Sequence, residues 1–204
     1  IDLPADSAII GGNYKYNFAR IDKPLAMSRQ QFEKEVEARE TKLKTTKHQK
    51  EPSLLRIIQR PDTSTAVMAF WETPGSGYQV ELEGHRWAHE TLFLLKTRAD
   101  DDRQDFAANR LRESLSRLRP RPDTEIPTEP GYCFGGGFIA NERWKNEEAL
   151  TEIAIAGHPD AFVTVWLFPL PSRKRDKPLL DRMGGATAQL GSLANGVRVL
   201  RKGD

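Results

Sequence analysis

Cysteine is almost missing from this sequence. Cys133 is the only one among 204 residues, which excludes an internal disulfide and any zinc site that needs several cysteines. Long apolar runs are missing too. The longest nearly apolar stretch, residues 161–168, is far shorter than the ~20 residues of a membrane-spanning helix. An excess of charge of one sign is also absent, because 31 Lys and Arg face 29 Asp and Glu. The net charge of +2 creates no overall field that favours nucleic acid or anionic lipid.

What remains is the composition of a folded chain. Hydrophobic residues make up 38% and charged residues 29%, which is typical of a globular protein and not of a disordered one. The length fits one or two domains. The chain begins with Ile1 rather than Met, so we expect a fragment or a processed chain.

Apolar spacing predicts helices and strands in alternation. Ser28, with Gln31 three residues later, is a capping box, and it should open a helix that runs to about Lys47 with Phe32, Val36 and Leu43 buried. A second helix should begin at residues 100–102, bury the stripe Ala107, Leu111, Leu115 and Leu118, and end before Pro120. A third helix should begin near Pro178. Strands are expected at residues 13–21, 53–59, 65–72, 78–83, 85–96, 132–140, 151–156, 161–168 and 197–201. Gly84 should mark a bulge or a tight turn.

Residues 120–130 contain four prolines and no core-forming pattern, so they are the best candidate for a linker. We therefore predict an α+β fold with two domains, each a mainly antiparallel sheet with packed helices. The domains would be residues 1–119 and 131–204, with few contacts between them and no sheet running through both.

Four local patterns are candidate catalytic or binding sites. His85 and His89 have the spacing of a zinc-binding helix, but they lie in a predicted strand, where residues four apart are too distant to share one ion. Cys133 lies between Tyr132 and Phe134 and is expected to be a buried packing residue rather than a nucleophile. The three glycines at 135–137 match no phosphate-binding motif. The basic residues at 173–177 are expected to be a solvated loop. The sequence thus predicts no catalytic, metal-binding or cofactor-binding residue, and we expect a protein that is not an enzyme.

One stretch resembles a known family. Residues 127–139 read Pro-Thr-Glu-Pro-Gly-Tyr-Cys-Phe-Gly-Gly-Gly-Phe-Ile. This resembles the opening of the C-terminal domain of the Tle cognate immunity proteins, which neutralise phospholipase effectors of the type VI secretion system. Tyr132 stands where the family usually has Phe, and Gly135 where Asp is common. Residues 11–16 with the Ser28 helix resemble the family's N-terminal domain, and residues 197–204 resemble a segment after which its second domain continues.

The resemblance implies two α+β domains and a periplasmic location. It also implies one protein partner, a lipase of the α/β-hydrolase type whose lid or active site is blocked. The second domain would then be incomplete at residue 204. The candidates for contacts with this partner are aromatic and basic residues, which commonly anchor interfaces: Arg143, Trp144, Trp87, Arg173, Lys174 and Arg175.

Two other functions stay open at this point. One is a small-molecule-binding or enzyme-like α+β protein with a site in the cleft between its domains. The other is a nucleic-acid binder that uses the basic loop, which the near-neutral charge disfavours. A lipase encoded beside this protein would favour the immunity function.

Overall fold

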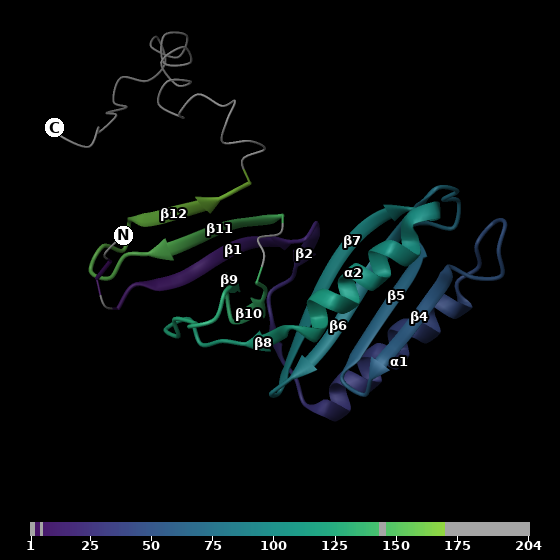
Figure 1. The fold of residues 1–204 in the computed structure, drawn as a ribbon, viewed down its shortest axis with the longest axis horizontal. Coiled ribbons are helices and arrows are strands. Elements are labelled where there is room, and N and C mark those ends of the chain that lie inside the picture. Colours follow the sequence, from purple (N-terminus) through teal and green to yellow (C-terminus); the bar gives the residue numbers. More distant parts are fainter. Residues whose placement is uncertain (1–2, 5, 143–145, 170–204) are drawn as a thin grey trace, which may run out of the picture. The chain divides into compact units, whose positions relative to one another are not determined.

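The computed structural model describes residues 3–4, 6–142 and 146–169, all within one compact unit, Ile1–Pro169 (Figure 1). The helix expected from Pro178 and the strand expected at residues 197–201 lie outside the described residues. The helices are α1 (Arg29–Thr45) and α2 (Gln104–Ser116), and the 3-10 helix η1 (Asp101–Arg103) directly precedes α2. The strands are β1 (Ala8–Tyr16), β2 (Ala19–Ile21), β3 (Leu25–Ala26), β4 (Leu55–Asp62), β5 (Thr65–Trp71), β6 (Gln79–Ala88), β7 (Thr91–Asp100), β8 (Leu118–Pro120), β9 (Gly131–Phe134), β10 (Gly137–Ala140), β11 (Glu147–Ala154) and β12 (Phe162–Leu167).

Within the described part of the chain these strands form two antiparallel sheets. The larger has nine strands in the order β12-β11-β1-β2-β7-β6-β5-β4, with β3 paired to β7. The smaller has three, in the order β8-β10-β9. Neighbouring strands in both sheets are antiparallel, as the predicted hairpins and short connections require.

The larger sheet corrects one expectation. β1 pairs with β11 from Ala8↔Ala154 to Tyr16↔Glu147, so strands before and after the Pro-rich residues 120–130 share one sheet. The expectation of separate sheets with few contacts is therefore wrong. The physical reason lies in the backbone of β1. One edge of β1 pairs with β2, and the N–H and C=O groups of its other edge form hydrogen bonds with β11. The domain boundaries at residues 119 and 131 stay a prediction.

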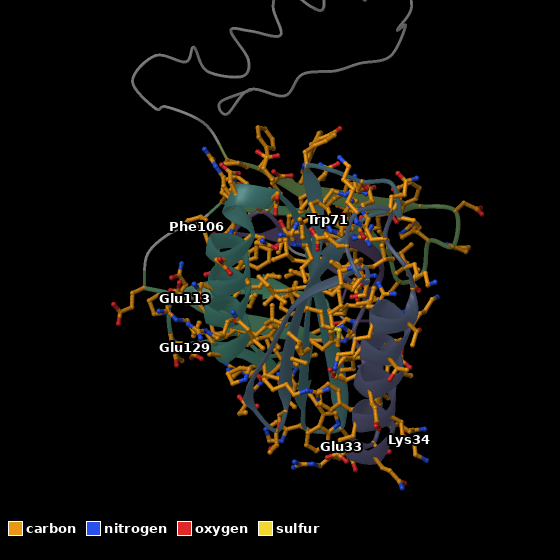
Figure 2. All side chains as sticks on the ribbon, turned by 90° about the vertical axis from the view of Figure 1, so that its right-hand side faces the viewer. Glu33, Lys34, Trp71, Phe106, Glu113 and Glu129 are labelled. Carbon is orange, nitrogen blue, oxygen red and sulfur yellow. The ribbon has the colours of Figure 1, made fainter. Side chains whose placement is uncertain are left out.

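The two helices cover opposite faces of the larger sheet (Figure 2). Successive residues of a strand point to opposite faces. In β6, Glu83 contacts Arg39 of α1, whereas a Cβ on the next residue, Gly84, would meet Leu115 of α2 at 2.7 Å. Gly84 pairs regularly with both neighbouring strands, so the expected bulge or turn there is wrong. The glycine instead lets α2 approach the sheet closely.

The helices match the sequence pattern closely. Ser28 and Gln31 form the predicted capping box, and Phe32, Val36 and Leu43 are buried, although α1 ends at Thr45 rather than at Lys47. The second helix begins at Gln104, after η1, without a side-chain cap from the aspartates. Of its predicted apolar stripe, Ala107, Leu111 and Leu115 are buried against β5, β6 and β7, whereas Leu118 is buried beyond the end of the helix, in β8.

Several predicted strands have other limits than expected. Residues 13–21 and 85–96 each break at a two-residue turn, Asn17–Phe18 and His89–Glu90, in which both φ angles are positive. Neither turn contains glycine, so the usual sequence signal of a hairpin is missing. Residues 132–140 likewise form a hairpin, β9 and β10, rather than one strand. β4 continues through Pro61, which an edge strand tolerates.

Cys133 is exposed, which corrects the expectation that it packs in the core. In β9 the side chains alternate, and the two large aromatic residues Tyr132 and Phe134 take the buried side, so the residue between them faces solvent. The aromatic neighbours that suggested burial are therefore the reason for its exposure.

The exposed thiol leads to a first prediction. A small alkylating reagent should label Cys133 in the native protein at a rate similar to that in urea. Cys133→Ala should change the free energy of unfolding by less than about 0.5 kcal/mol, because no packed group is removed. Mass spectrometry and urea titration measure the two quantities. Labelling only after unfolding would contradict the exposed position.

A buried ion pair joins α1 to the sheet. Arg39 donates two hydrogen bonds of 2.8 Å to the carboxylate of Glu83 and lies over the ring of Phe70, 4.8 Å from its centroid. Burial raises the pKa of Glu83, but His85, 3.6 Å away, and the two bonds from Arg39 outweigh it and lower the pKa to about 2. Glu83 therefore stays ionised beneath α1.

A second prediction follows for Arg39→Met, which keeps the side chain's apolar length and removes its charge. The variant should lose about 3 kcal/mol at pH 7, because it leaves a carboxylate buried without its main partner. The pKa of Glu83 is about 2 in the folded protein and about 4.5 in the unfolded chain. The ionised carboxylate therefore stabilises the fold above pH 4.5, and this stabilisation is lost as the pH falls toward about 2. The deficit of the variant should therefore shrink as the pH falls from 6 to 3.

Urea unfolding across this pH range measures the effect. The matched control is Arg60→Met, which removes an exposed partner of Glu40 and should cost less than about 1 kcal/mol. A deficit for Arg39→Met that does not change with pH would contradict the role of Glu83.

Candidate functional site

A groove of about 300 Å³ opens between β1, the connection from β2 to β3, and the turn from β9 to β10. It brings together residues far apart in the sequence: the start of the chain, the Pro-rich segment and the hairpin that carries the glycines. The lining residues are Ile9, Ile10, Gly11, Gly12, Tyr14, Ile21, Asp22, Lys23, Pro24, Asp123, Gly135 and Gly136.

A β-bulge in β1 sets the apolar rim of this groove. The register with β11 shifts between Ile9 and Gly11, so Ile10 has no partner opposite it. Its side chain is 61% exposed. A bulge redirects a side chain locally, and here it turns an isoleucine toward solvent beside the groove.

Aromatic packing fixes the β9–β10 hairpin against the larger sheet. Phe134 lies 6.2 Å from Tyr14 of β1, and Tyr132 lies 5.6 Å from Tyr16, measured between ring centroids. The Tyr132 hydroxyl donates a 2.6 Å hydrogen bond to the carbonyl oxygen of Glu148 in β11. Burial raises the pKa of this hydroxyl, which keeps it protonated as a donor. The side of the groove formed by the hairpin is thereby held rigidly.

One buried arginine organises the Pro-rich segment. Arg121 Nη1 donates to the carbonyl oxygens of Pro122, Asp123 and Glu125, at 3.1, 3.3 and 2.7 Å. Nε and Nη2 of the same side chain reach the carbonyl oxygens of Gly137 and Phe134 at 3.4 Å. The segment that the sequence suggested as a free linker is thus tied to the hairpin beside it.

The two acidic residues that line the groove have partners within the chain, and Lys23 adds one exposed positive charge. Asp22 is paired with Arg20 at 3.1 Å and with Lys96 at 2.9 Å. Asp123 accepts a 3.1 Å hydrogen bond from the backbone N–H of Gly136, whose φ of +77° suits glycine. The acidic groups are therefore occupied. Among the described residues no cluster of His, Cys, Asp or Glu has the geometry of a metal site. The arrangement is suited to binding an apolar segment.

A wider hollow of about 690 Å³ between α1 and the strands β4 and β5 is lined mainly by charged side chains. Three of its four acids have basic partners: Glu33 with Arg29, Glu40 with Lys44 and Arg60, and Asp62 with Arg86. Because these charges satisfy one another, this hollow is the solvated face of α1.

The structure places only one of the six predicted contact residues. Trp87 lies half-buried in β6, where its indole N–H donates a 2.8 Å bond to the carbonyl oxygen of Met27 and Arg29 lies 5.8 Å from its ring centroid. It does not line the groove. Arg143, Trp144, Arg173, Lys174 and Arg175 lie outside the described residues.

The two histidines are separated as expected. His85 is buried in β6 on the face of α1, and His89 is at the tip of the β6–β7 hairpin. The groove residues Ile9 and Ile10, in contrast, were missed, because the predicted strand began only at residue 13. Two adjacent isoleucines before a pair of glycines were the signal that could have revealed them.

Comparison with known families decides the identity. The Tle cognate immunity protein 4 N-terminal domain matches residues 1–121, and the C-terminal domain of the same family matches residues 125–204. The chain belongs to this family. The family resemblance, the two-domain α+β fold and the expectation of a protein that is not an enzyme are thereby confirmed. The groove is lined from both family domains, by residues 9–24 of the first and residues 135–136 of the second.

Solved structures show the same fold. The apo immunity protein TplEi of the T6SS from Pseudomonas aeruginosa has a TM-score of 0.81 and 23% identity and covers 99% of this chain and 67% of that one. A chain of the Tle4–Tli4 complex has a TM-score of 0.81 and 23% identity, and the match covers 100% of this chain and 66% of that one. TplEi complexed with "L" peptide has a TM-score of 0.72 and 23% identity, and the match again covers 100% of this chain and 66% of that one. This chain thus spans about two thirds of the length of these proteins. A comparison with curated proteins found no match.

The Arg121 network gives a third prediction. Arg121→Met should destabilise the protein by at least about 2 kcal/mol, because it leaves several carbonyl oxygens near Arg121 without their donor. It should also speed backbone hydrogen exchange in residues 122–136. Arg119→Met is the matched control, since Arg119 pairs with the half-exposed Glu125 and Glu129 and should cost less than about 1 kcal/mol. Equal effects of the two substitutions would contradict the network.

Proposed function

We propose that this chain binds and inhibits a cognate type VI secretion phospholipase effector, with a segment of the effector's lid or active-site rim seated in the groove between the family domains. The observation that carries the proposal is the match of both immunity domains along the chain. The Tle4–Tli4 complex, one chain of which shares the fold, supports a partner of the Tle class.

The groove has the properties of an anchor site rather than of a whole interface. A stable protein–protein interface buries about 1,600 Å² in total, and most of the binding energy comes from a few central residues. Ile10 offers an exposed apolar contact at the rim, the acids Asp22 and Asp123 have partners within the chain, and the charge of Lys23 is exposed to solvent. An apolar side chain of the effector would therefore bind here without leaving a buried charge unpaired.

The contact residues suggested by the sequence remain part of this proposal. Arg143, Trp144, Arg173, Lys174 and Arg175 would contribute from the second domain. Trp87 would contribute its ring face, because its indole N–H is already bonded within the chain.

Small-molecule binding is less well supported by the groove. A ligand pocket usually combines apolar walls with a few polar groups that are free to fix the ligand. Here the polar groups of Asp22 and Asp123 are used within the protein.

We also propose a periplasmic location, where the protein would meet an incoming effector. No helix among the described residues is long and apolar enough to cross a membrane. Fractionation of the source cells, with an antibody against the chain, tests the location. Recovery with the cytoplasmic markers would contradict it.

The fourth prediction concerns inhibition. The chain should inhibit the lipase encoded beside it stoichiometrically and reversibly on a micellar substrate. Ile10→Asp should weaken inhibition at least tenfold, because it places a charge at the apolar rim. Ile126→Asp is the matched control, since Ile126 is 89% exposed in the Pro-rich segment and does not line the groove.

Each outcome has a distinct meaning. A folded wild-type chain that leaves the lipase fully active at several-fold molar excess would overturn the proposed function. Equal inhibition by wild type and Ile10→Asp would retain the function and exclude the groove as its contact site.

A further inference from the structure

The tip of the β1–β2 hairpin has a residue that local structure does not favour. Asn17 and Phe18 form a two-residue turn with φ angles of 51° and 68°. Such turns favour Asn-Gly, because a positive φ brings the Cβ of other residues into steric conflict. Phe18 nevertheless occupies the second position, and its side chain is 60% exposed. A strained backbone at an exposed aromatic residue suggests that the side chain contacts something other than its own hairpin.

Arg110 of α2 lies between this residue and a second exposed phenylalanine. Its guanidinium carbon is 5.1 Å from the ring centroid of Phe18 and 5.7 Å from that of Phe106. Phe106, one helical turn before Arg110, is 68% exposed and is labelled on α2 in Figure 2. We call these three residues the Phe18–Arg110–Phe106 cluster.

The charge of Arg110 has no acidic partner among the described residues. By contrast, Arg98 nearby pairs with Glu72 and Glu81 at 2.7 and 2.8 Å. Burial lowers the pKa of Arg110, and no ion pair among the described residues offsets this effect. A groove of about 280 Å³ runs beside it, and its charged lining residues are Arg98, Arg103 and Arg110 against one acid, Asp100, with Phe106 at its side. This surface thus presents positive charge and aromatic rings together.

We propose that the Phe18–Arg110–Phe106 cluster is a second docking site for the effector, and that it receives an aspartate or glutamate carboxylate flanked by apolar side chains. The inference rests on the proposed function, because it takes the effector as the partner. None of the three residues lines the groove described above, so this contact is separate from it.

The chemistry favours this occupant. A carboxylate forms a strong charge-assisted pair with a guanidinium whose plane is already held between two rings. Arginine and aromatic residues that are largely desolvated on binding are the residues that most often dominate interface energies. An apolar neighbour of the carboxylate would cover the exposed faces of Phe18 and Phe106.

Three variants test the proposal by calorimetric titration with the cognate effector. Arg110→Gln should raise the dissociation constant at least tenfold, because the carboxylate loses its partner. Phe18→Gly should raise it at least fivefold, yet it should leave the melting temperature unchanged or higher, since glycine relieves the turn. Arg112→Gln makes the same change of charge at an exposed position on the same helix and should stay within twofold of wild type.

The outcomes separate this inference from the proposed function. Effector binding by wild type together with unchanged binding by Arg110→Gln and Phe18→Gly would overturn the docking site alone. An effector that does not bind wild type would overturn both. A melting temperature of Arg110→Gln well below that of Arg112→Gln, without effector, would show that Arg110 serves the stability of this chain and would also overturn the docking site.

Discussion

The pairing of β1 with β11 is the constraint on which the rest of the structure depends. It brings residues 8–16 beside residues 147–154 and so joins the two family domains through one sheet. The bulge at Ile10 arises within this pairing, and Tyr132 bonds to the carbonyl of Glu148 on the paired strand. Without the pairing of β1 with β11, the distance between β1 and the β9–β10 hairpin across the groove would not be fixed.

Arginine side chains organise this protein more than its near-zero net charge suggests. Arg39 fixes α1 to the sheet through Glu83, and Arg121 ties the Pro-rich segment to the neighbouring hairpin. Arg110 differs because its guanidinium lies over two aromatic rings and has no acidic partner among the described residues. The planar guanidinium serves all three roles, because it can donate several bonds at once and can also stack on a ring.

The sequence predicted those features that depend on neighbours along the chain. The capping box at Ser28 and the buried stripes of both helices depend on local spacing, and they were confirmed. The failures have a different origin. The turns at Asn17 and His89 contain no glycine, and the exposure of Cys133 depends on which side of β9 meets the core. The pairing of β1 with a strand more than 130 residues away leaves no local pattern at all. The groove, which depends on that pairing, could not be predicted either.

This separation along the chain also sets an order of events during synthesis. β1 emerges from the ribosome, or from an export channel, before its partner β11, and both helices and the whole Pro-rich segment lie between them. Contacts between such distant residues form slowly, because a long loop must close first. Until then β1 presents unpaired backbone groups to other chains, the situation in which partly made proteins aggregate. The strand that joins the two domains is therefore also the part of the molecule that must be protected longest.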